Sequence, residues 1–315
     1  MQQLIFRSKY PILEACMNRG STLELALAVY AAGGYPSLCS WTYNRHFSAM
    51  QRDLDKFVEQ TNSNRIHLSF ELDELPDPKV CHDIMKSHNV PTMEIIYGYT
   101  DSPRPQNEFL PNTELALQQL LKPLHDMGVK IFKRIYSPVD EYTMHKHFLD
   151  GFCIKGNEAA GFTGFIPTKE LFLQQKQLTP NAILIPYGGV GTAAQVKEYI
   201  DLGAEIVAVG TLLAMSAESP IKTETKLAAI QADKEKIKTK NHTFQLGSTV
   251  VERKQNMLEF QPYIGQDDAN GTAGLVRGLY KKNNKDGHAY LGHSINHVTS
   301  ILSCTQIIQN LVKCL

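Results

Sequence analysis

Short apolar runs alternate with amphipathic segments over about the first 215 residues of the chain. The apolar runs are typical of buried strands, and the segments between them repeat apolar residues at helical spacing. Strict alternation of strand and helix requires parallel strands joined by right-handed crossovers. Eight strands are predicted, at 10–17, 35–40, 65–72, 92–97, 129–136, 151–155, 182–186 and 206–209. Helices are predicted between them, including those at 48–60, 77–88, 112–127, 139–149 and 167–178.

The stretch 182–219 contains two glycine turns, each of which separates a strand from a helix. The first turn holds Gly188 and Gly189, and the second is Gly210-Thr211. Because the turns follow consecutive parallel strands, they bring bare backbone N–H groups to one side of a sheet, where these groups can bind a dianion. A (β/α)8 barrel characteristically has its phosphate site after strands seven and eight. The chain is therefore predicted to be an α/β protein with the (β/α)8 TIM-barrel fold.

Two other interpretations of the glycine turns stay open. Residues 189–194 also satisfy the looser dinucleotide fingerprint of an open, doubly wound sheet. That fold needs an acidic residue about 20 positions later to bind the ribose. The position is occupied by the turn at Gly210, and Glu205 lies at the wrong end of the strand. The glycines could also serve only to make tight turns.

The composition changes after residue 232. Residues 233–240 are rich in lysine, and 241–292 are rich in Gly, Asn, Lys and Asp with little periodicity. A helical apolar pattern returns at 294–315. We therefore expect a barrel at 1–232 and an extension at 233–315, in which an irregular segment crosses the catalytic mouth and a terminal helix packs on the barrel.

Charge and cysteine content restrict the partners of the protein. The 315 residues include 32 Lys and Arg and 32 Asp and Glu, so no net field favours nucleic acid or an anionic membrane. The six cysteines show neither CxxC nor zinc-type pairing, which suggests reduced thiols in the cytoplasm. No signal peptide, membrane-spanning run or metal-ligand spacing is found in the sequence. A small-molecule substrate is expected, and a homodimer is compatible with these features.

Five motifs resemble, in order and spacing, the FMN-dependent nitronate monooxygenases. They are YPILEACM, AGGYPS, GFCIKGNEAAGFTG, IPYGGVGTAAQV and VAVGT. The same barrel family includes the flavin-dependent enoyl-acyl carrier protein reductases. The resemblance covers about residues 8–220 and reappears in the terminal segment that begins LGHSINHV. It implies an FMN-dependent oxidoreductase that oxidises alkyl nitronates with O2.

The resemblance also implies positions for a noncovalently bound FMN. Its phosphate would lie on Gly188, Gly189, Gly210 and Thr211, its isoalloxazine against Ala15, Cys16 and Met17, and Gly161 would allow close approach of the backbone. Lys155 occupies the place where the family commonly has a glutamine near the flavin pyrimidine edge. A cation there would stabilise negative charge at N1/O2 of reduced flavin. The alternative is a solvated or salt-bridged lysine at the end of a strand.

The chain departs from the family pattern at one important position. Alignment of residues 158–161 with the family's glutamate-alanine-glycine-glycine run places Phe162 where a histidine is usual. Phenylalanine cannot transfer a proton, so Phe162 is expected to face an apolar substrate and no catalytic base is assigned. The other titratable candidates, none of which is assigned a role, are Glu14, His67, Glu71, Glu94, Lys133, His288, His293 and His297.

Other functions remain open beside nitronate oxidation. The first is reduction of an enoyl thioester, with NAD(P)H as electron donor and acyl carrier protein as partner. The second is a flavin- or phosphate-binding barrel without turnover, which the loss of the histidine at position 162 suggests. The third is a phosphate-handling enzyme without flavin, which would be colourless.

Overall fold

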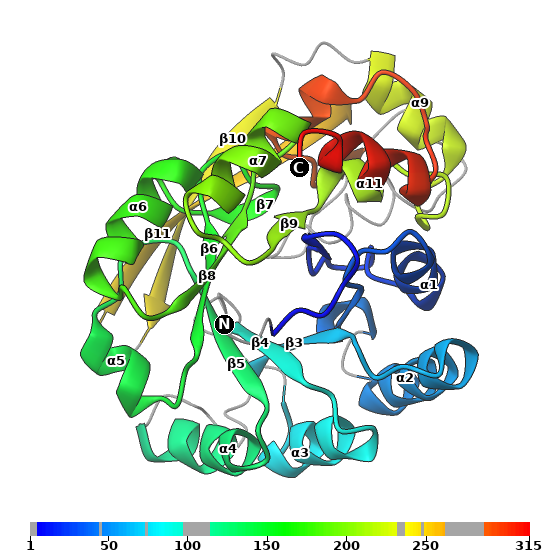
Figure 1. Ribbon diagram of the computed structural model, residues 1–315. Coiled ribbons are helices and arrows are strands. Elements are labelled where there is room, and N and C mark those ends of the chain that lie inside the picture. Colours follow the sequence, from blue (N-terminus) through cyan, green and yellow to red (C-terminus); the bar gives the residue numbers. More distant parts are fainter. Residues whose placement is uncertain are drawn as a thin grey trace.

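The computed structural model describes residues 5–43, 46–72, 75–96, 114–231, 237–246, 249–261 and 287–315 (Figure 1). Eight parallel strands form one sheet in the order β1-β9-β8-β6-β5-β4-β3-β2. They are β1 (Ile12–Glu14), β2 (Ser37–Cys39), β3 (His67–Glu71), β4 (Thr92–Ile96), β5 (Lys130–Ile135), β6 (Gly151–Lys155), β8 (Ile183–Tyr187) and β9 (Val207–Val209). A single parallel bridge between Leu13 and Tyr35 joins the two edges. The barrel is therefore nearly closed, which confirms the predicted (β/α)8 fold.

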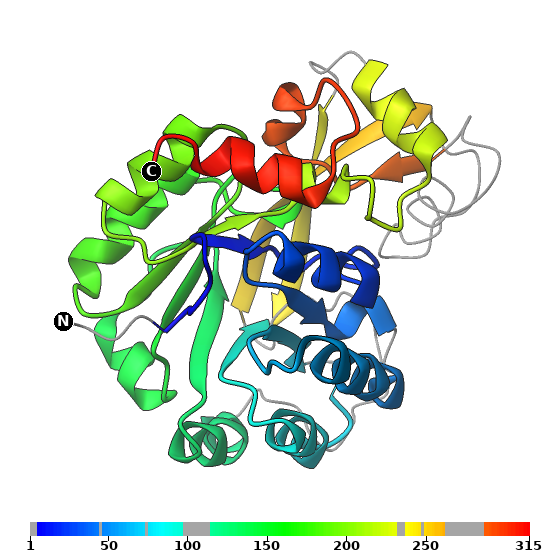
Figure 2. The same cartoon turned by 45° about the vertical axis from the view of Figure 1, so that its right-hand side comes forward.

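Helices surround the strands, as Figures 1 and 2 show from two directions. They are α1 (Leu23–Ala31), α2 (Phe47–Thr61), α3 (Pro78–Ser87), α4 (Glu114–Asp126), α5 (Glu141–Lys146), α6 (Thr168–Leu178), α7 (Ala193–Asp201), α8 (Thr211–Ala214) and α9 (Thr223–Gln231). Their starts are encoded locally. Asp77 caps α3 ahead of a proline in its first turn, and Thr192 with Gln195 forms a capping box on α7.

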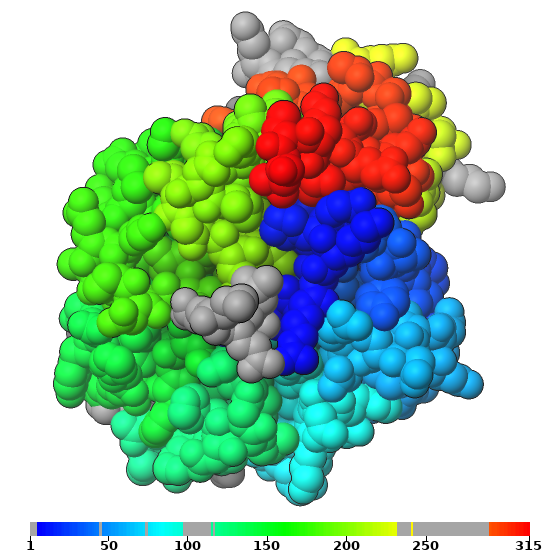
Figure 3. Space-filling model, in the orientation of Figure 1, coloured from blue at the N-terminus to red at the C-terminus, as the bar shows by residue number. Residues whose placement is uncertain are grey.

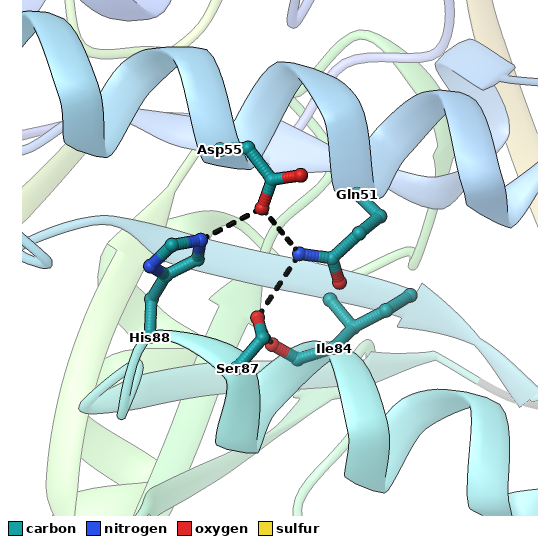
Figure 4. Close-up of polar contacts among 5 residues, drawn as sticks. All are labelled: Gln51, Asp55, Ile84, Ser87 and His88. Atoms are coloured by element: carbon teal, nitrogen blue, oxygen red, sulfur yellow. Dashed lines mark hydrogen bonds and ion pairs between the residues drawn. The ribbon is translucent and has the colours of Figure 1, made fainter.

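Polar contacts fix neighbouring helices of the outer layer to each other. Asp55 on α2 accepts hydrogen bonds from His88 and Gln51, each at 2.7 Å, and Gln51 donates to Ser87 at the end of α3 at 3.0 Å (Figure 4). Ser87 in turn donates to the carbonyl of Ile84 at 2.8 Å. The side chains come from two helices, so they set how α2 and α3 lie against each other.

Alternate residues of each strand face two different apolar regions. One side of the strands packs against the helices in the largest core cluster. The other side fills the barrel, where Phe6 from the N-terminal segment packs with Leu13, Tyr35, Phe132 and Ile206. Phe6 contacts the rings of Tyr35 and Phe132, with centroids 5.0 and 5.5 Å away. The barrel is thus a packed core and not a channel.

The extension beyond the barrel differs from the expected irregular segment. Strands β10 (Ile237–Leu246) and β11 (Thr249–Gln261) form a long antiparallel hairpin. Strands β12 (Gly287–Ala289) and β7 (Gly161–Thr163) both pair with β11, which gives a second, four-stranded sheet. The expectation of irregular structure was wrong for 237–246, 249–261 and 287–289, because no marked apolar alternation signals these strands and β7 and β12 reach β11 from distant parts of the chain. Residues 262–286 lie outside the described part of the chain.

The helix expected at 294–315 is divided. It consists of a 3-10 helix, η4 (His293–His297), and the helix α11 (Cys304–Val312), whose start is fixed by a Ser303–Gln306 capping box. Ile307, Ile308 and Leu311 of α11 are buried in the main core, so the terminal helix does pack on the barrel. In Figure 3 it lies beside the blue N-terminal part of the chain. Among the described residues, no helix is long and apolar enough to cross a membrane.

Candidate active site

Both predicted glycine turns lie side by side at the carboxyl ends of the barrel strands. Tyr187 on β8 pairs with Ala208 on β9, so the turns that follow emerge from neighbouring strands. Gly188 and Gly189 have φ angles of +116° and +73°, which side chains other than glycine's rarely tolerate. A Cβ on Gly188 would also lie only 2.7 Å from that of Ala159. Local backbone geometry therefore requires glycine in the first turn.

The turns present unpaired hydrogen-bond donors. Within the described part of the chain, no residue accepts a hydrogen bond from the backbone N–H of Gly188, Gly189, Gly210 or Thr211. The start of α7 differs, because Thr192 N–H donates to the side chain of Gln195 at 3.1 Å. Gly188, Gly189 and Gly210 are partly exposed, and Thr211 is the first residue of α8, where a backbone N–H has no partner within the helix. These N–H groups are therefore open to water or to a bound anion, and the turns are compatible with both the tight-turn and the anion-site interpretation.

The turn after β1 lies against the second glycine turn. A Cβ built on Gly210 would be 3.4 Å from the Cβ of Ala15 and 3.7 Å from the sulfur of Met17. Ser21 holds this turn, since its hydroxyl accepts the N–H of Met17 at 3.0 Å and lies 3.4 Å from the carbonyl of Ala15. Cys16 is buried, and burial raises the pKa of its thiol well above the ordinary value. It is therefore an uncharged side chain near neutral pH.

Glu14 closes part of the gap between β1 and β2. Its carboxylate accepts the backbone N–H of Ser37 at 3.1 Å, in place of a ladder bond from the neighbouring strand. The side chain is fully buried, and burial raises its pKa to about 8. Glu14 therefore links β1 to β2, and its carboxyl group holds a proton to a higher pH than an exposed glutamate does.

A buried ion pair lies inside the barrel below the mouth. Nε and Nη2 of Arg134 donate to the two carboxylate oxygens of Glu94, each at 2.7 Å. Relative exposures are 8% for Arg134 and 0% for Glu94. The hydroxyl of Tyr187 lies 3.4 Å from the same carboxylate, and the guanidinium lies 5.3 Å from the centroid of its ring. Glu94 is one of the candidates predicted from the sequence, whereas Arg134 and Tyr187 are not.

His67 and Cys16 lie beside this ion pair. Their ligand atoms and those of Glu94 are all within 4.8 Å of one another. Burial lowers the pKa of His67 to about 4, and its Nδ1 lies 3.2 Å from the hydroxyl of Thr92. Both oxygens of Glu94 are taken by Arg134, whose positive charge opposes a second cation. These three residues are therefore poorly suited to binding a metal ion.

Lys155 lies at the end of β6, above the ion pair. It is half-buried and stands opposite Tyr187 in the ladder. Burial, together with the positive charge of Arg134, lowers its pKa to about 7. In the described ranges it has no hydrogen-bond or ion-pair partner, so the salt-bridged alternative finds no support. A half-buried, unpaired ammonium is costly and is typical of sites that bind an anion or move a proton.

Glu158 and Phe162, which both follow β6, make different contacts. The carboxylate of Glu158 accepts the N–H and the hydroxyl of Thr168 at 2.9 and 2.6 Å, at the start of α6. Glu158 is thus a helix-capping group. Phe162 packs against Ile96 and Tyr136, at the ends of β4 and β5, and its backbone pairs with β11. Phe162 therefore belongs to an apolar cluster near the mouth.

The C-terminal residues 287–298, which we call the strap, return to the glycine turns. The N–H of Gly292 donates to Oγ1 of Thr211 at 3.0 Å, and the N–H of His293 donates to the carbonyl of Glu158 at 2.9 Å. The ring of His297 packs against Gly191. The candidates named from the sequence include His293 and His297 of the strap but not Gly292. Its only sequence signal was the recurrence of the resemblance at LGHSINHV.

The remaining candidates are spread over β3, β5, β12 and η4. Glu71 is buried at the end of β3, Lys133 lies on β5 and His288 lies on β12, while His293 and His297 are exposed.

Comparison with known proteins identifies the family of the chain. The model of the nitronate monooxygenase family matches residues 2–313. The chain belongs to this family. Family membership makes it an oxidoreductase, as the motifs had indicated. A search of curated proteins found no match.

Solved structures share the fold at low sequence identity. FabK from Thermotoga maritima has a TM-score of 0.76 at 19% identity, covering 98% of this chain and 93% of its own. Nitroalkane oxidase from Streptomyces ansochromogenes has a TM-score of 0.69 at 16% identity, covering 97% and 95%. The enoyl reductase domain of MlnA from Bacillus amyloliquefaciens has a TM-score of 0.65 at 11% identity, covering 98% and 94%. At these identities the likeness supports the barrel fold alone.

Proposed function

We propose that this family member is an FMN-dependent oxidoreductase that oxidises alkyl nitronates with O2. The observation that carries the proposal is the set of unpaired N–H groups on Gly188, Gly189, Gly210 and Thr211. Four such donors at adjacent strand ends suit a phosphate monoester. The turn at residues 15–17 lies beside Gly210, where its residues would be close to a ring system attached to that phosphate.

The residues around the mouth have separate roles in this proposal. FMN, when bound, supplies the electron acceptor that oxidises the substrate and passes electrons to O2. Ala15 and Met17 would support the ring system, and Gly161, with φ +66°, would let the backbone approach it. Lys155 offers a positive charge to an anion in the mouth. Phe162, with Ile96 and Tyr136, gives an apolar wall for the alkyl group.

The absence of a proton-transferring side chain at position 162 agrees with a nitronate substrate. A nitronate is already deprotonated, so its oxidation requires no base. A neutral nitroalkane must first lose a carbon-bound proton, and Phe162 cannot accept it. We therefore expect the enzyme to oxidise nitronates well and their parent nitroalkanes poorly.

The first experiment is to purify the full chain and record its visible spectrum before and after denaturation, with chromatography of any released chromophore. Released FMN is the expected result. A colourless protein that also fails to take up added FMN would refute the proposal. Anaerobic mixing with an alkyl nitronate, its parent nitroalkane or NAD(P)H then identifies the reductant, because only the true electron donor bleaches the flavin rapidly.

One alternative also has support in the site. The apolar cluster around Phe162 would accommodate the chain of an enoyl thioester, in which case NAD(P)H is the donor and acyl carrier protein the partner. Fast bleaching by NAD(P)H but not by nitronate would favour this reductase. Bound flavin that neither donor reduces would instead indicate a barrel that binds flavin without turnover.

A further inference from the structure

The strap joins two loops that lie far apart in the sequence. It meets the turn after β9 through the bond from Gly292 to Thr211, and the loop after β6 through the bond from His293 to Glu158. Its first residues pair with β11 as strand β12. Buried Leu291 and Ile295 anchor it on Ala214 and Met215, just beyond the turn after β9. The strap is thus fixed at the edge of the anion-binding turns.

The hydroxyl of Thr211 is the side chain that connects the strap with these turns. Thr211 is only 5% exposed, and its oxygen accepts the N–H of Gly292. Among the described residues, none accepts the hydroxyl proton of Thr211. A hydroxyl that accepts from one direction must point its hydrogen elsewhere, and a buried donor without an acceptor is costly. The Thr211 hydroxyl is therefore a donor held ready for a ligand.

Close approach of the strap depends on Gly292. Its φ of −89° is accessible to any residue, so the backbone itself does not require glycine. A Cβ at this position would lie 2.5 Å from the carbonyl oxygen of Glu158 and 2.8 Å from the nitrogen of Ala160. Even a methyl group would therefore push the strap away from Thr211.

We propose that the strap is part of the phosphate site: Gly292 orients the Thr211 hydroxyl as an additional donor to the cofactor phosphate, and phosphate binding in turn fastens the strap. This inference rests on the proposed function, since it takes the ligand to be a flavin phosphate. Thr211 touches the ligand, and Gly292 is a positioning residue that acts through it. Because the two events are linked, a ligand that carries the phosphate stabilises the docked strap.

The test compares FMN with riboflavin, which has the same ring system but no phosphate. The apoprotein of the full chain is titrated with each flavin, and binding is followed by flavin fluorescence. Thr211→Val should weaken FMN binding about 10- to 100-fold, as expected for the loss of a hydrogen bond to a charged group, and leave riboflavin binding unchanged. Thr211→Ser should retain FMN affinity. Gly292→Ala should reproduce the effect of Thr211→Val.

Thr179→Val is the matched control. Thr179 is also buried and hydrogen-bonded, to Gln175 at the end of α6, and it precedes β8, whereas the glycine turns follow β8 and β9. Its replacement should change both flavin affinities equally or not at all. A second readout is amide hydrogen exchange of the strap, which FMN should slow more than riboflavin does in the wild type but not in Thr211→Val.

The outcomes separate this inference from the proposed function. A wild-type protein that prefers FMN to riboflavin, with Thr211→Val unchanged or equally weakened toward both flavins, would overturn the role of the strap and leave the proposed function intact. Wild-type protein that binds neither flavin would overturn both. A selective loss of FMN affinity in Thr211→Val and Gly292→Ala, but not in Thr179→Val, supports the inference.

Discussion

Replacing Arg134 by methionine removes one half of the buried ion pair and leaves the other half without compensation. In the native protein, burial raises the pKa of Glu94, but the attraction and hydrogen bonds of Arg134 outweigh burial and hold that pKa below its usual value. The carboxylate makes two bonds of 2.7 Å and has no exposure to water. Removing one partner of such a pair typically costs about 3–5 kcal/mol. We expect Arg134→Met to lose a free energy of unfolding in this range at pH 7.5.

The pH dependence gives a sharper test. In Arg134→Met only burial remains, so the folded-state pKa of Glu94 lies above the unfolded value. The protonated form then favours the folded state, and the variant regains stability relative to wild type as the pH falls through the folded pKa toward the unfolded one. Urea denaturation of the apoprotein at pH 7.5 and 5.5 measures this difference.

A double variant provides the control. Glu94→Gln combined with Arg134→Met removes both charges, and its stability should lie nearer to the wild type than that of Arg134→Met alone. The reasoning would be refuted if Arg134→Met lost less than about 1 kcal/mol, or if the two substitutions destabilised the protein additively. Either result would mean that the interior of the barrel admits enough water to solvate a lone carboxylate.

Three further predictions concern single residues of the barrel. In the wild type, kcat/KM for a nitronate should fall as the pH rises through about 7, where Lys155 loses its charge. Lys155→Met should lack this fall, and pH profiles of the same shape for both proteins would exclude Lys155 as the anion-binding group. Gly188→Ala should destabilise the protein by more than about 1–3 kcal/mol. The loss should exceed that of Gly128→Ala, because Gly128 also has a positive φ but no atom lies within 4 Å of a Cβ built on it. Equal losses of stability in thermal denaturation would rule out the clash with Ala159. The raised pKa of Glu14 stabilises the native state at low pH, and this stabilisation is lost as the pH rises from about 4.5 to 8. Glu14→Gln should therefore make stability, measured by urea denaturation, depend less on pH in this range. An unchanged dependence on pH would contradict the burial of that carboxyl.

Much of the barrel could be predicted because its signals are local. Each of the eight strands matches a short apolar run, and the positive φ angles of Gly188 and Gly189 are a property of the turn itself. The same locality explains why the positions of the two glycine turns could be predicted from sequence. Two turns after consecutive parallel strands must emerge at one end of a sheet, whatever the rest of the chain does. The placement of Ala15 and Met17 against Gly210 follows from β1 pairing with β9.

The strands of the extension and the partners of the buried charges could not be predicted in this way. Strand β11 is held by β7, about 90 residues earlier in the chain, and by β12, and no apolar alternation marks these pairings. Arg134 looked like one more basic residue beside Lys133, because a strand's sequence does not say which side chain meets a carboxylate across the barrel. Gly292 had no visible reason to be glycine until Glu158 and Ala160 lay against it.

The sequence by itself therefore determined the (β/α)8 barrel, its family and the place of the two glycine turns, because apolar runs and glycine conformations depend on a few neighbouring residues. Only the tertiary structure decided that Glu94 pairs with Arg134, that Lys155 stands unpaired above them, and that the strap meets Thr211. These contacts join residues 40 to 81 positions apart or depend on what surrounds a side chain. Closure of the barrel brings such residues together, and no local pattern records the distances that result.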